Sequence, residues 1–316
     1  MQKGGIWLIN AFMKRTKHKN INGWIVIDKP QGMGSTEVVN ITRRLLDANK
    51  NGHTGTLDPF ATGVLPIAFG EATKLIAYVT DGKKEYEFVL KFGFDTTTDD
   101  LQGEPVHTGG RVPSKDELLR ILPAFVGKIK QTPPAYSAIK IGGVRAYKLA
   151  REGKNFEIAE REVEIYSLDF LKQVSDDSFQ FKVCCSKGTY IRTLGKDIAL
   201  KLQSYGHLTA LRRTRCANFS ISDTILLENL KNMVYEKSEQ GFLMPVQTVL
   251  RDIAALAVSA EDAFKLRLGQ RLSATTYGVS ERQDEVLAAF EKDCLTALVR
   301  VEGKAIVPIR VFNLSK

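Results

Sequence analysis

The chain of 316 residues has no apolar run of the roughly 18 residues that a membrane helix requires. The apolar stretch near its start, residues 6–13, is short and has basic residues on its downstream side, so we expect neither a signal peptide nor an anchor. The four cysteines include no Cys-x-x-Cys pair, and two of them are adjacent, which is a poor arrangement for a disulfide framework or a zinc site. The sequence therefore predicts a cytoplasmic protein with reduced thiols and no bound metal.

The chain also lacks the glycine motifs of nucleotide-binding enzymes. A glycine-rich turn at 31–34 precedes a helical pattern, but the dinucleotide pattern Gly-x-Gly-x-x-Gly fails there because Glu37 stands where its last glycine belongs. No Gly-x-x-x-x-Gly-Lys-Ser/Thr sequence occurs anywhere in the chain. A nucleotide-cofactor enzyme is therefore disfavoured.

What the chain has is an ordinary globular composition with a basic excess. It is 43% hydrophobic and 26% charged, with a formal net charge of +9, and its length suggests about two domains. Residues 247–316 carry ten basic and nine acidic side chains, so nearly all of the excess lies upstream. Residues 140–154 hold five basic side chains and one acid, and residues 187–215 hold seven and one. Each stretch alone is compatible with polyanion binding or with a solvated helix face.

The hydrophobic pattern mixes strands and helices without strict β-α-β alternation, which favours an α+β fold. A short apolar strand at 24–28 is followed by a turn and by a helix that Ser35 or Thr36 is expected to cap. Alternating aromatic and apolar residues predict a strand over 85–94, headed by Tyr86, and a second strand over 179–185. A helix follows, which Gly206 is expected to end, and residues 296–311 predict a hairpin in a separate small unit.

The segment from Gly52 to Gly63 is the most informative part of the chain. Its twelve residues include three glycines, three threonines, one proline and one carboxylate, a composition typical of a tight, ordered loop. Pro59 restricts Asp58 to extended conformations, so such a loop can hold this carboxylate rigidly. From the residues alone, a catalytic Asp58 and an ordinary Asp-Pro turn both remain open.

Six segments in order resemble the TruB family of tRNA pseudouridine synthases. They are GWIVIDKPQGM at 23–33, HTGTLDPFATG at 53–63, KEYEF at 84–88, TPPAYSA at 132–138, GTYIRTL at 188–194 and HLTALRR at 207–213. The resemblance runs from about residue 23 to residue 220, and the tail after Gln247 resembles the small PUA-like domain of bacterial members. Taken together, the six matches favour the catalytic interpretation of Asp58.

The resemblance implies a fold and a domain order. The fold is a pseudouridine synthase fold, with a central mixed, largely antiparallel sheet flanked by helices and a small C-terminal PUA-like domain. Residues 1–20 would be a basic flexible tail of unassigned role, which the resemblance does not cover. Residues 21–246 would form the catalytic domain, with a thumb-like insertion at about 132–154, and residues 247–316 would form the PUA-like RNA-binding domain.

The resemblance also implies an activity, the isomerisation of uridine to pseudouridine at position 55 in the T arm of tRNA. No cofactor, metal or energy source is implied, and neither is a membrane or an obligatory protein partner; we expect a monomer. Two other classes stay open, a non-catalytic RNA-binding or folding protein and a guide-dependent subunit of an RNA–protein complex. The presence of Asp58, Tyr86 and Arg192 counts against the first of them.

Each site residue is carried over from a matching motif. Asp58 would be the nucleophile, attacking either the base or the anomeric carbon of the ribose, and Arg192 would keep its carboxylate charged in a dry pocket. Tyr86 would stack on a uracil that has been flipped out of the T loop. The remaining substrate-binding positions are Lys29, in a supporting or phosphate role, His53, which would fill the vacated stack, and Tyr190 and Leu211, which would line the pocket.

The thumb-like insertion would contact the RNA backbone. Its basic side chains Lys140, Arg145, Lys148 and Arg151 would bind phosphates, and Gly142 and Gly143 would permit movement. Recognition of the folded arm by its shape would supply the specificity.

Overall fold

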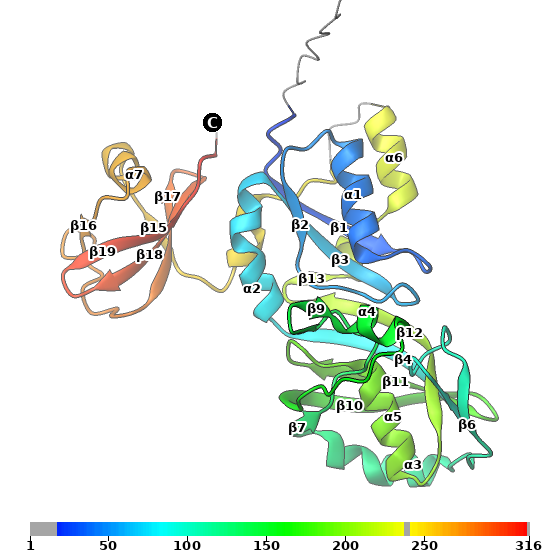
Figure 1. Ribbon diagram of the computed structural model, residues 1–316. Helices are drawn as coiled ribbons and strands as arrows, with labels where there is room; N and C mark the ends of the chain where they lie inside the picture. Colours follow the sequence, from blue (N-terminus) through cyan, green and yellow to red (C-terminus); the bar gives the residue numbers. More distant parts are fainter. Residues whose placement is uncertain (1–17, 237–240, 315–316) are drawn as a thin grey trace, which may run out of the picture.

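A ten-stranded mixed sheet dominates the computed structural model, which describes residues 18–236 and 241–314 (Figure 1). In spatial order its strands are β14 (Ile225–Leu226), β1 (Gly23–Lys29), β3 (Thr62–Phe69), β12 (Gly206–Cys216), β4 (Lys84–Phe92), β11 (Ser178–Cys185), β10 (Arg161–Ser175) and β7 (Gly127–Gln131), with β2 (Asn51–His53) on β3 and β13 (Phe219–Ser220) on β12. Within this sheet, as far as the structure describes the chain, only the β1/β14 and β3/β12 pairs are parallel. The expected mixed, largely antiparallel sheet in an α+β fold is confirmed.

Strands β1 and β3 are buried on both faces, which explains their nearly continuous apolar sequences. One face of the two strands packs against α1 (Ser35–Leu45) and α6 (Leu227–Tyr235), which lie together at one end of the sheet (Figure 1). Alternate residues of β1, including Trp24 and Val26, point into a second apolar cluster on the opposite face. Because β1 and β3 are packed on both faces, they hold the chain segment between them in place.

The other half of the sheet buries one aromatic face. Phe88, Leu90 and Phe92 of β4 lie against α5 (Ile191–Lys201) and α3 (Lys115–Ile121), so the predicted alternation is confirmed. The predicted end of the strand is wrong, because Gly93 adopts a φ of 107° and Phe94 starts the separate strand β5 (Phe94–Thr96), which pairs with β6 (Pro105–Thr108). That short hairpin stands beside the main sheet.

Two predicted helix boundaries are also wrong. Gly34, not Ser35 or Thr36, is the N-cap of α1, since the hydroxyl of Ser35 is used elsewhere. Helix α5 ends at Lys201 and Gln203 takes a positive φ of 54°, whereas Gly206 starts β12, where a Cβ would lie 2.9 Å from the carbonyl oxygen of Lys91. Gly206 therefore allows the neighbouring strands to pack closely, and it does not end the helix.

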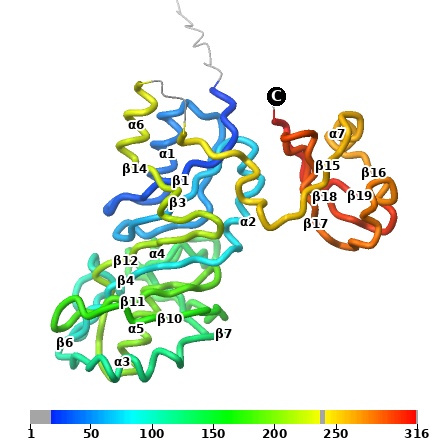
Figure 2. Tube along the Cα trace, turned by 180° about the vertical axis from the view of Figure 1, so that it is seen from behind, coloured from blue at the N-terminus to red at the C-terminus, as the bar shows by residue number. Residues whose placement is uncertain are grey.

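A separate five-stranded sheet forms the C-terminal part of the described chain and stands to one side of the large sheet (Figure 2). Its strands, in spatial order, are β15 (Ala255–Ala257), β17 (Val286–Glu291), β18 (Cys294–Glu302), β19 (Ala305–Val311) and β16 (Leu272–Ser273), with helix α7 (Ala260–Arg267). The predicted hairpin is confirmed as β18–β19. Leu295, Leu298 and Phe312 share an apolar cluster with Trp24 and Phe219, so the two sheets have a common core.

The insertion at 132–154 forms a small hairpin and a helix. Strands β8 (Lys140–Ile141) and β9 (Val144–Arg145) are joined by Gly142 and Gly143, whose φ values of 55° and 85° make the tight turn that favours glycine. Helix α4 (Ala146–Arg151) follows. The remaining helices are α2 (Ile76–Asp81), η1 (Gly70–Leu75), η2 (Leu122–Phe125), η3 (Ile221–Asp223) and η4 (Val246–Leu250).

Residues 1–17 of the predicted basic tail lie outside the described residues. At residue 18 the chain is attached to the fold, because the His18 side chain contacts that of Asp47 at 2.5 Å and Lys19 forms a bridge with Ala48. No helix in the described ranges combines the length and the apolar character needed to cross a membrane.

Candidate active site

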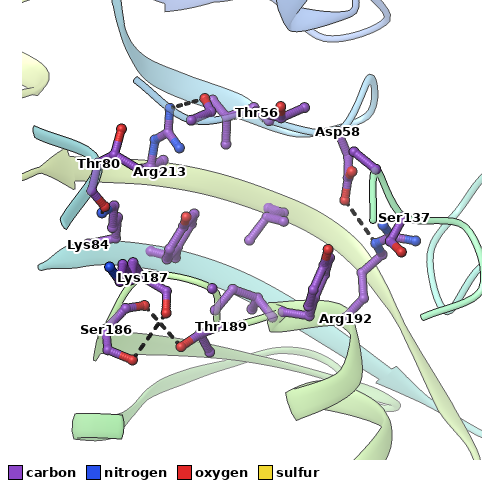
Figure 3. Close-up of a pocket in the computed structure, with 18 of the residues that line it drawn as sticks. Thr56, Asp58, Thr80, Lys84, Ser137, Ser186, Lys187, Thr189, Arg192 and Arg213 are labelled. Carbon is purple, nitrogen blue, oxygen red and sulfur yellow. Dashed lines mark hydrogen bonds and ion pairs between the residues drawn. The ribbon is translucent and has the colours of Figure 1, made fainter. Parts of the chain in front are cut away.

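A cavity of about 280 Å³ opens between β4, β12, the start of α5 and the insertion (Figure 3). Its lining includes Asp58, Tyr86, Ser137, Tyr190, Arg192, Leu211 and Arg213. Asp58 and Arg192 point toward each other at one end, while Arg213 lies at the other end near Thr80 and Lys84 (Figure 3). The cavity thus has a carboxylate end and a cationic end.

The loop that carries Asp58 runs from β2 to β3 and is held by its backbone. The hydroxyl of Ser35 donates to the carbonyl oxygen of Leu57 at 2.9 Å and accepts from the same residue's N–H at 2.8 Å. The carbonyl of Pro59 accepts hydrogen bonds from the N–H of Gly32 at 2.8 Å and from Nζ of Lys29 at 3.2 Å. The residues on both sides of Asp58 are therefore fixed, as expected from the loop's composition.

The guanidinium of Arg192 forms an ion pair with Asp58, with Nε 2.8 Å from Oδ2. The arginine side chain is only 3% exposed, and its other nitrogens donate to the carbonyl oxygens of Thr98 and Tyr136, each at 2.9 Å. Burial raises the pKa of Asp58, and the positive charge of Arg192 opposes that rise. The structure thus brings together the carboxylate and the cation that sequence reasoning paired.

A second carboxylate belongs to this group and was not singled out from the sequence. Oδ2 of Asp100 lies 3.7 Å from Nε of Arg192, and its negative charge adds to the rise in the pKa of Asp58. Asp100 is held by hydrogen bonds from the hydroxyl of Thr98 and the N–H of Gln102. The run Asp-Thr-Thr-Thr-Asp-Asp at 95–100 is a visible signal, but its proximity to Asp58 depends on tertiary structure.

The middle of the cavity is aromatic and apolar. Tyr86 lies on β4 between Val183 and Arg213 on the neighbouring strands, and burial raises the pKa of its hydroxyl to about 12, so the phenol is neutral at physiological pH. Leu211 and Tyr190 also line the cavity, and the guanidinium of Arg161 stands over the Tyr190 ring with its carbon 4.6 Å from the ring centroid. All three predicted pocket residues face one space.

The cationic end contains two residues that lay within the resembling motifs but were not picked out. Arg213 is 1% exposed, and its Nε donates to the carbonyl of Val64 at 2.8 Å. Lys84 is 6% exposed, and its ammonium group binds backbone carbonyls at the end of α2. Gly63 must lack a side chain here, because a Cβ would lie 2.2 Å from the carbonyl oxygen of Arg213.

Lys29 and His53 are not among the residues that line the cavity. Lys29 is fully buried, and its Nζ donates to the carbonyls of Pro30, Met33 and Pro59, so it supports the Asp58 loop and cannot reach a phosphate from this position. Burial lowers its pKa to about 8. His53 is half-buried, its Nδ1 accepts from the N–H of Gly55, and burial lowers its pKa, which keeps the imidazole neutral at pH 7.

The predicted backbone-binding residues Lys140, Arg145, Lys148 and Arg151 are all exposed on the β8–β9 hairpin and α4. Arg145 also donates to the carbonyl of Ala138, and Arg151 stands over the ring of Tyr147 with its guanidinium carbon 5.6 Å from the centroid. Both contacts leave the charge at the surface. Within the described parts of the chain, no group of three or more His, Cys, Asp or Glu side chains is arranged to hold a metal ion.

Comparisons with known proteins show which family the chain matches. Residues 43–191 match the model of the TruB family pseudouridylate synthase N-terminal domain, and residues 192–251 match that of the tRNA pseudouridylate synthase B C-terminal domain. A protein of Caulobacter vibrioides named tRNA pseudouridine synthase B is 42% identical over 96% of this chain and 99% of its own length. One of the same name from Gluconacetobacter diazotrophicus is 46% identical over 83% of this chain and 86% of its own length.

Among solved structures, the crystal structure of a Cbf5-Nop10-Gar1 complex contains a similar chain. The TM-score is 0.70 at 26% identity, with 92% of this chain and 84% of that chain covered. A chain of the archaeal box H/ACA sRNP Nop10-Cbf5 complex gives a TM-score of 0.67 at 24% identity, with 92% and 86% covered, a likeness of fold.

Proposed function

The chain belongs to the TruB family of pseudouridylate synthases, and on that premise we propose that it isomerises uridine to pseudouridine at position 55 in the T loop of tRNA. The observation that carries the proposal is the ion pair of Asp58 and Arg192, which opens on an apolar, aromatic cavity. The names of relatives that match nearly the whole chain support tRNA as the substrate.

The reaction breaks the bond between N1 of uracil and C1′ of ribose and forms a bond from C5 to C1′. The hydrogen lost from C5 is balanced by a hydrogen gained at N1, so the product is an isomer and needs no reductant or nucleoside triphosphate. Asp58 acts as the nucleophile, on the base or on C1′, and must be ionised to do so. Arg192 supplies the charge that keeps it ionised despite its partial burial.

The target uridine must leave the T loop, because a stacked base cannot reach a carboxylate inside the cavity. Extrusion costs a few kcal/mol. Tyr86 repays part of that cost by stacking on the uracil, an interaction of about 1 to 3 kcal/mol per base. Tyr190 and Leu211 close the space around the base, and His53 fills the gap in the T loop from the neighbouring β2.

The exposed cations of the insertion bind the RNA backbone, and the C-terminal sheet, in the place of the PUA-like domain, provides a second RNA contact. We propose that the protein acts in the cytoplasm as a monomer without an obligatory protein partner. The insertion supports the stand-alone mode, since Ser137 and Ala138 of the same segment line the cavity and its four basic side chains are exposed.

The test is to incubate the purified protein with an unmodified tRNA transcript, without cofactor, and to map pseudouridine by chemical labelling and primer extension. We expect a signal at the uridine at position 55 of the T loop, and none with Asp58→Asn, which should still bind tRNA. Asp116→Asn is the matched control, because it removes an exposed carboxylate in the first turn of α3. Ordinary turnover by Asp58→Asn would remove that residue from the mechanism.

A guide-dependent enzyme is the alternative that one observation favours, namely the structural similarity to a chain of a Cbf5-Nop10-Gar1 complex. Binding of an unguided tRNA in an electrophoretic assay separates the two modes. Affinity without partner proteins supports the stand-alone enzyme, and its absence supports the guide-dependent one.

A further inference from the structure

Unpartnered polar atoms gather around the cavity. Among the described residues, three buried side-chain atoms have neither a hydrogen-bond partner nor an ion pair, namely Oγ of Ser137, Nε of Arg161 and Oγ1 of Thr214, whereas Nε of Arg192 has its contact with Asp58. Ser137 and Arg161 line the cavity. Buried polar atoms are almost always paired in native proteins, so such a concentration indicates a surface that is completed by a ligand.

Of the two cavity-lining residues that carry such an unpartnered atom, Ser137 is the neutral one. It is 4% exposed, and its own carbonyl accepts a hydrogen bond from the N–H of Tyr147 in α4. The preceding carbonyl, that of Tyr136, accepts from Arg192, whose Nε contacts Asp58 at 2.8 Å. Ser137 is therefore fixed at the carboxylate end of the cavity, as Figure 3 shows, although it belongs to the insertion.

We propose that Ser137 is a substrate-binding residue whose hydroxyl forms a hydrogen bond with the 2′-hydroxyl of the target nucleotide. This inference rests on the proposed function. A serine hydroxyl has one donor and two acceptor positions, and so does a ribose 2′-hydroxyl, so the two groups can pair in either direction. The contact distinguishes a ribonucleotide from a deoxyribonucleotide at the reacting position.

The location of Asp58 decides which group of the nucleotide reaches Ser137. The carboxylate has to lie against the glycosidic bond, while the base occupies the apolar region lined by Tyr86, Tyr190 and Leu211. The sugar then lies at the carboxylate end, and the hydroxyl on C2′, next to C1′, is its polar group nearest to the reacting bond. The insertion thereby contacts the reacting nucleotide itself as well as the phosphates.

The inference is tested by a binding cycle in the Asp58→Asn background, so that no turnover occurs. Complete tRNAs are assembled by ligation with uridine, 2′-deoxyuridine or 2-thiouridine at the target position, and their dissociation constants are measured with Ser137 and with Ser137→Ala. Thr132→Ala is the matched control, because it removes an exposed hydroxyl from the same insertion. Ser137→Ala loses no hydrogen bond within the protein, so its melting temperature should not fall.

With Ser137 present, we expect 2′-deoxyuridine to weaken binding about 3- to 10-fold, the loss of one hydrogen bond. In Ser137→Ala the deoxy substitution should change the affinity less than twofold, whereas Thr132→Ala should retain the full effect. A deoxy effect of the same size with and without Ser137 would overturn the assignment. The assignment would also be overturned if Ser137→Ala lost only the sensitivity to 2-thiouridine, because Ser137 would then contact O2 of the base. Failure of every variant to bind any tRNA would instead reject the proposed function, and this inference with it.

Discussion

Two replacements of Arg192 distinguish the effect of its positive charge from the effect of its hydrogen-bond geometry. Arg192→Gln removes the cation beside Asp58, and Arg192→Lys keeps a cation but lacks the planar group that reaches Asp58 and the carbonyls of Thr98 and Tyr136 together. Two unit charges 2.8 Å apart attract by about 1.5 kcal/mol in water and about 6 kcal/mol at an effective dielectric constant of 20. Because the Asp58 side chain is 32% exposed, we take the lower part of this range.

If Arg192→Gln removes even the smaller of these attraction energies, the equilibrium between ionised and protonated Asp58 shifts about tenfold toward the protonated acid, which is not nucleophilic. The pKa of Asp58 is already raised by burial, so the acid limb of the pH–rate profile should move further toward neutral pH, and kcat at a pH below that limb should fall about tenfold. Arg192→Lys should leave the acid limb nearly in place. It should instead lower the free energy of unfolding by about 2 to 4 kcal/mol, because two buried carbonyls lose a charged donor.

The assay is single-turnover formation of pseudouridine in an unmodified tRNA between pH 5 and 8, together with urea unfolding of each variant. Tritium release from C5-labelled uridine reports the rate. An acid limb that stays at the same pH in Arg192→Gln would refute the view that Arg192 keeps Asp58 ionised. An unchanged unfolding free energy in Arg192→Lys would refute the positioning role of its carbonyl contacts.

Three further changes test other parts of the site. Tyr86→Leu should reduce the single-turnover rate far more than tRNA affinity, and a defect confined to binding would count against stacking on the uracil. Neutralising Arg145 and Lys148 together should weaken binding and reduce the slope of log K against log salt by about 1 to 2; an unchanged slope would reject the insertion as a phosphate-binding surface. Because the pKa of Lys29 falls from 10.5 to about 8 on folding, the unfolded chain binds more protons at this amine between those pH values. Its contribution to the unfolding free energy should therefore rise with pH across that window, by at most about 3 kcal/mol, which is measured as the difference between wild type and Lys29→Met. A flat difference would show that the amine is not desolvated.

The sequence predicted those helices and strands that depend only on the pattern of residues within the element itself. The alternation of β4 and β11 is present as expected, because the order of polar and apolar residues within each strand determines it. Ser35 shows where this reasoning ends. Its sequence position predicted a helix cap, but its hydroxyl binds the backbone of Leu57, a partner 22 residues away that only the folded chain brings near.

Some residues of the candidate site could likewise be predicted from the sequence, and others could not. The loop composition and the family resemblance indicated Asp58 and Arg192, which the structure places in contact. Asp100 and Arg213 could not be chosen from the sequence, because their proximity to the cavity depends on strand pairing and on the β5–β6 hairpin. Lys29 matched a motif, yet only its burial shows that it holds the loop rather than an RNA phosphate.

The apolar core common to the two sheets makes them interdependent in stability. Trp24 of the first strand is fully buried, its Nε1 donates to the carbonyl of Val246, and its ring packs on Phe219 with the centroids 5.5 Å apart. Loss of the C-terminal sheet would leave this aromatic pair and the strands beneath it open to water, at a cost of roughly 1.5 to 3 kcal/mol for each large side chain exposed. A fragment of this chain that ends at residue 246 would thus expose apolar surface and be prone to aggregation and proteolysis, and a chain with a shortened second sheet would need a more polar surface on the first.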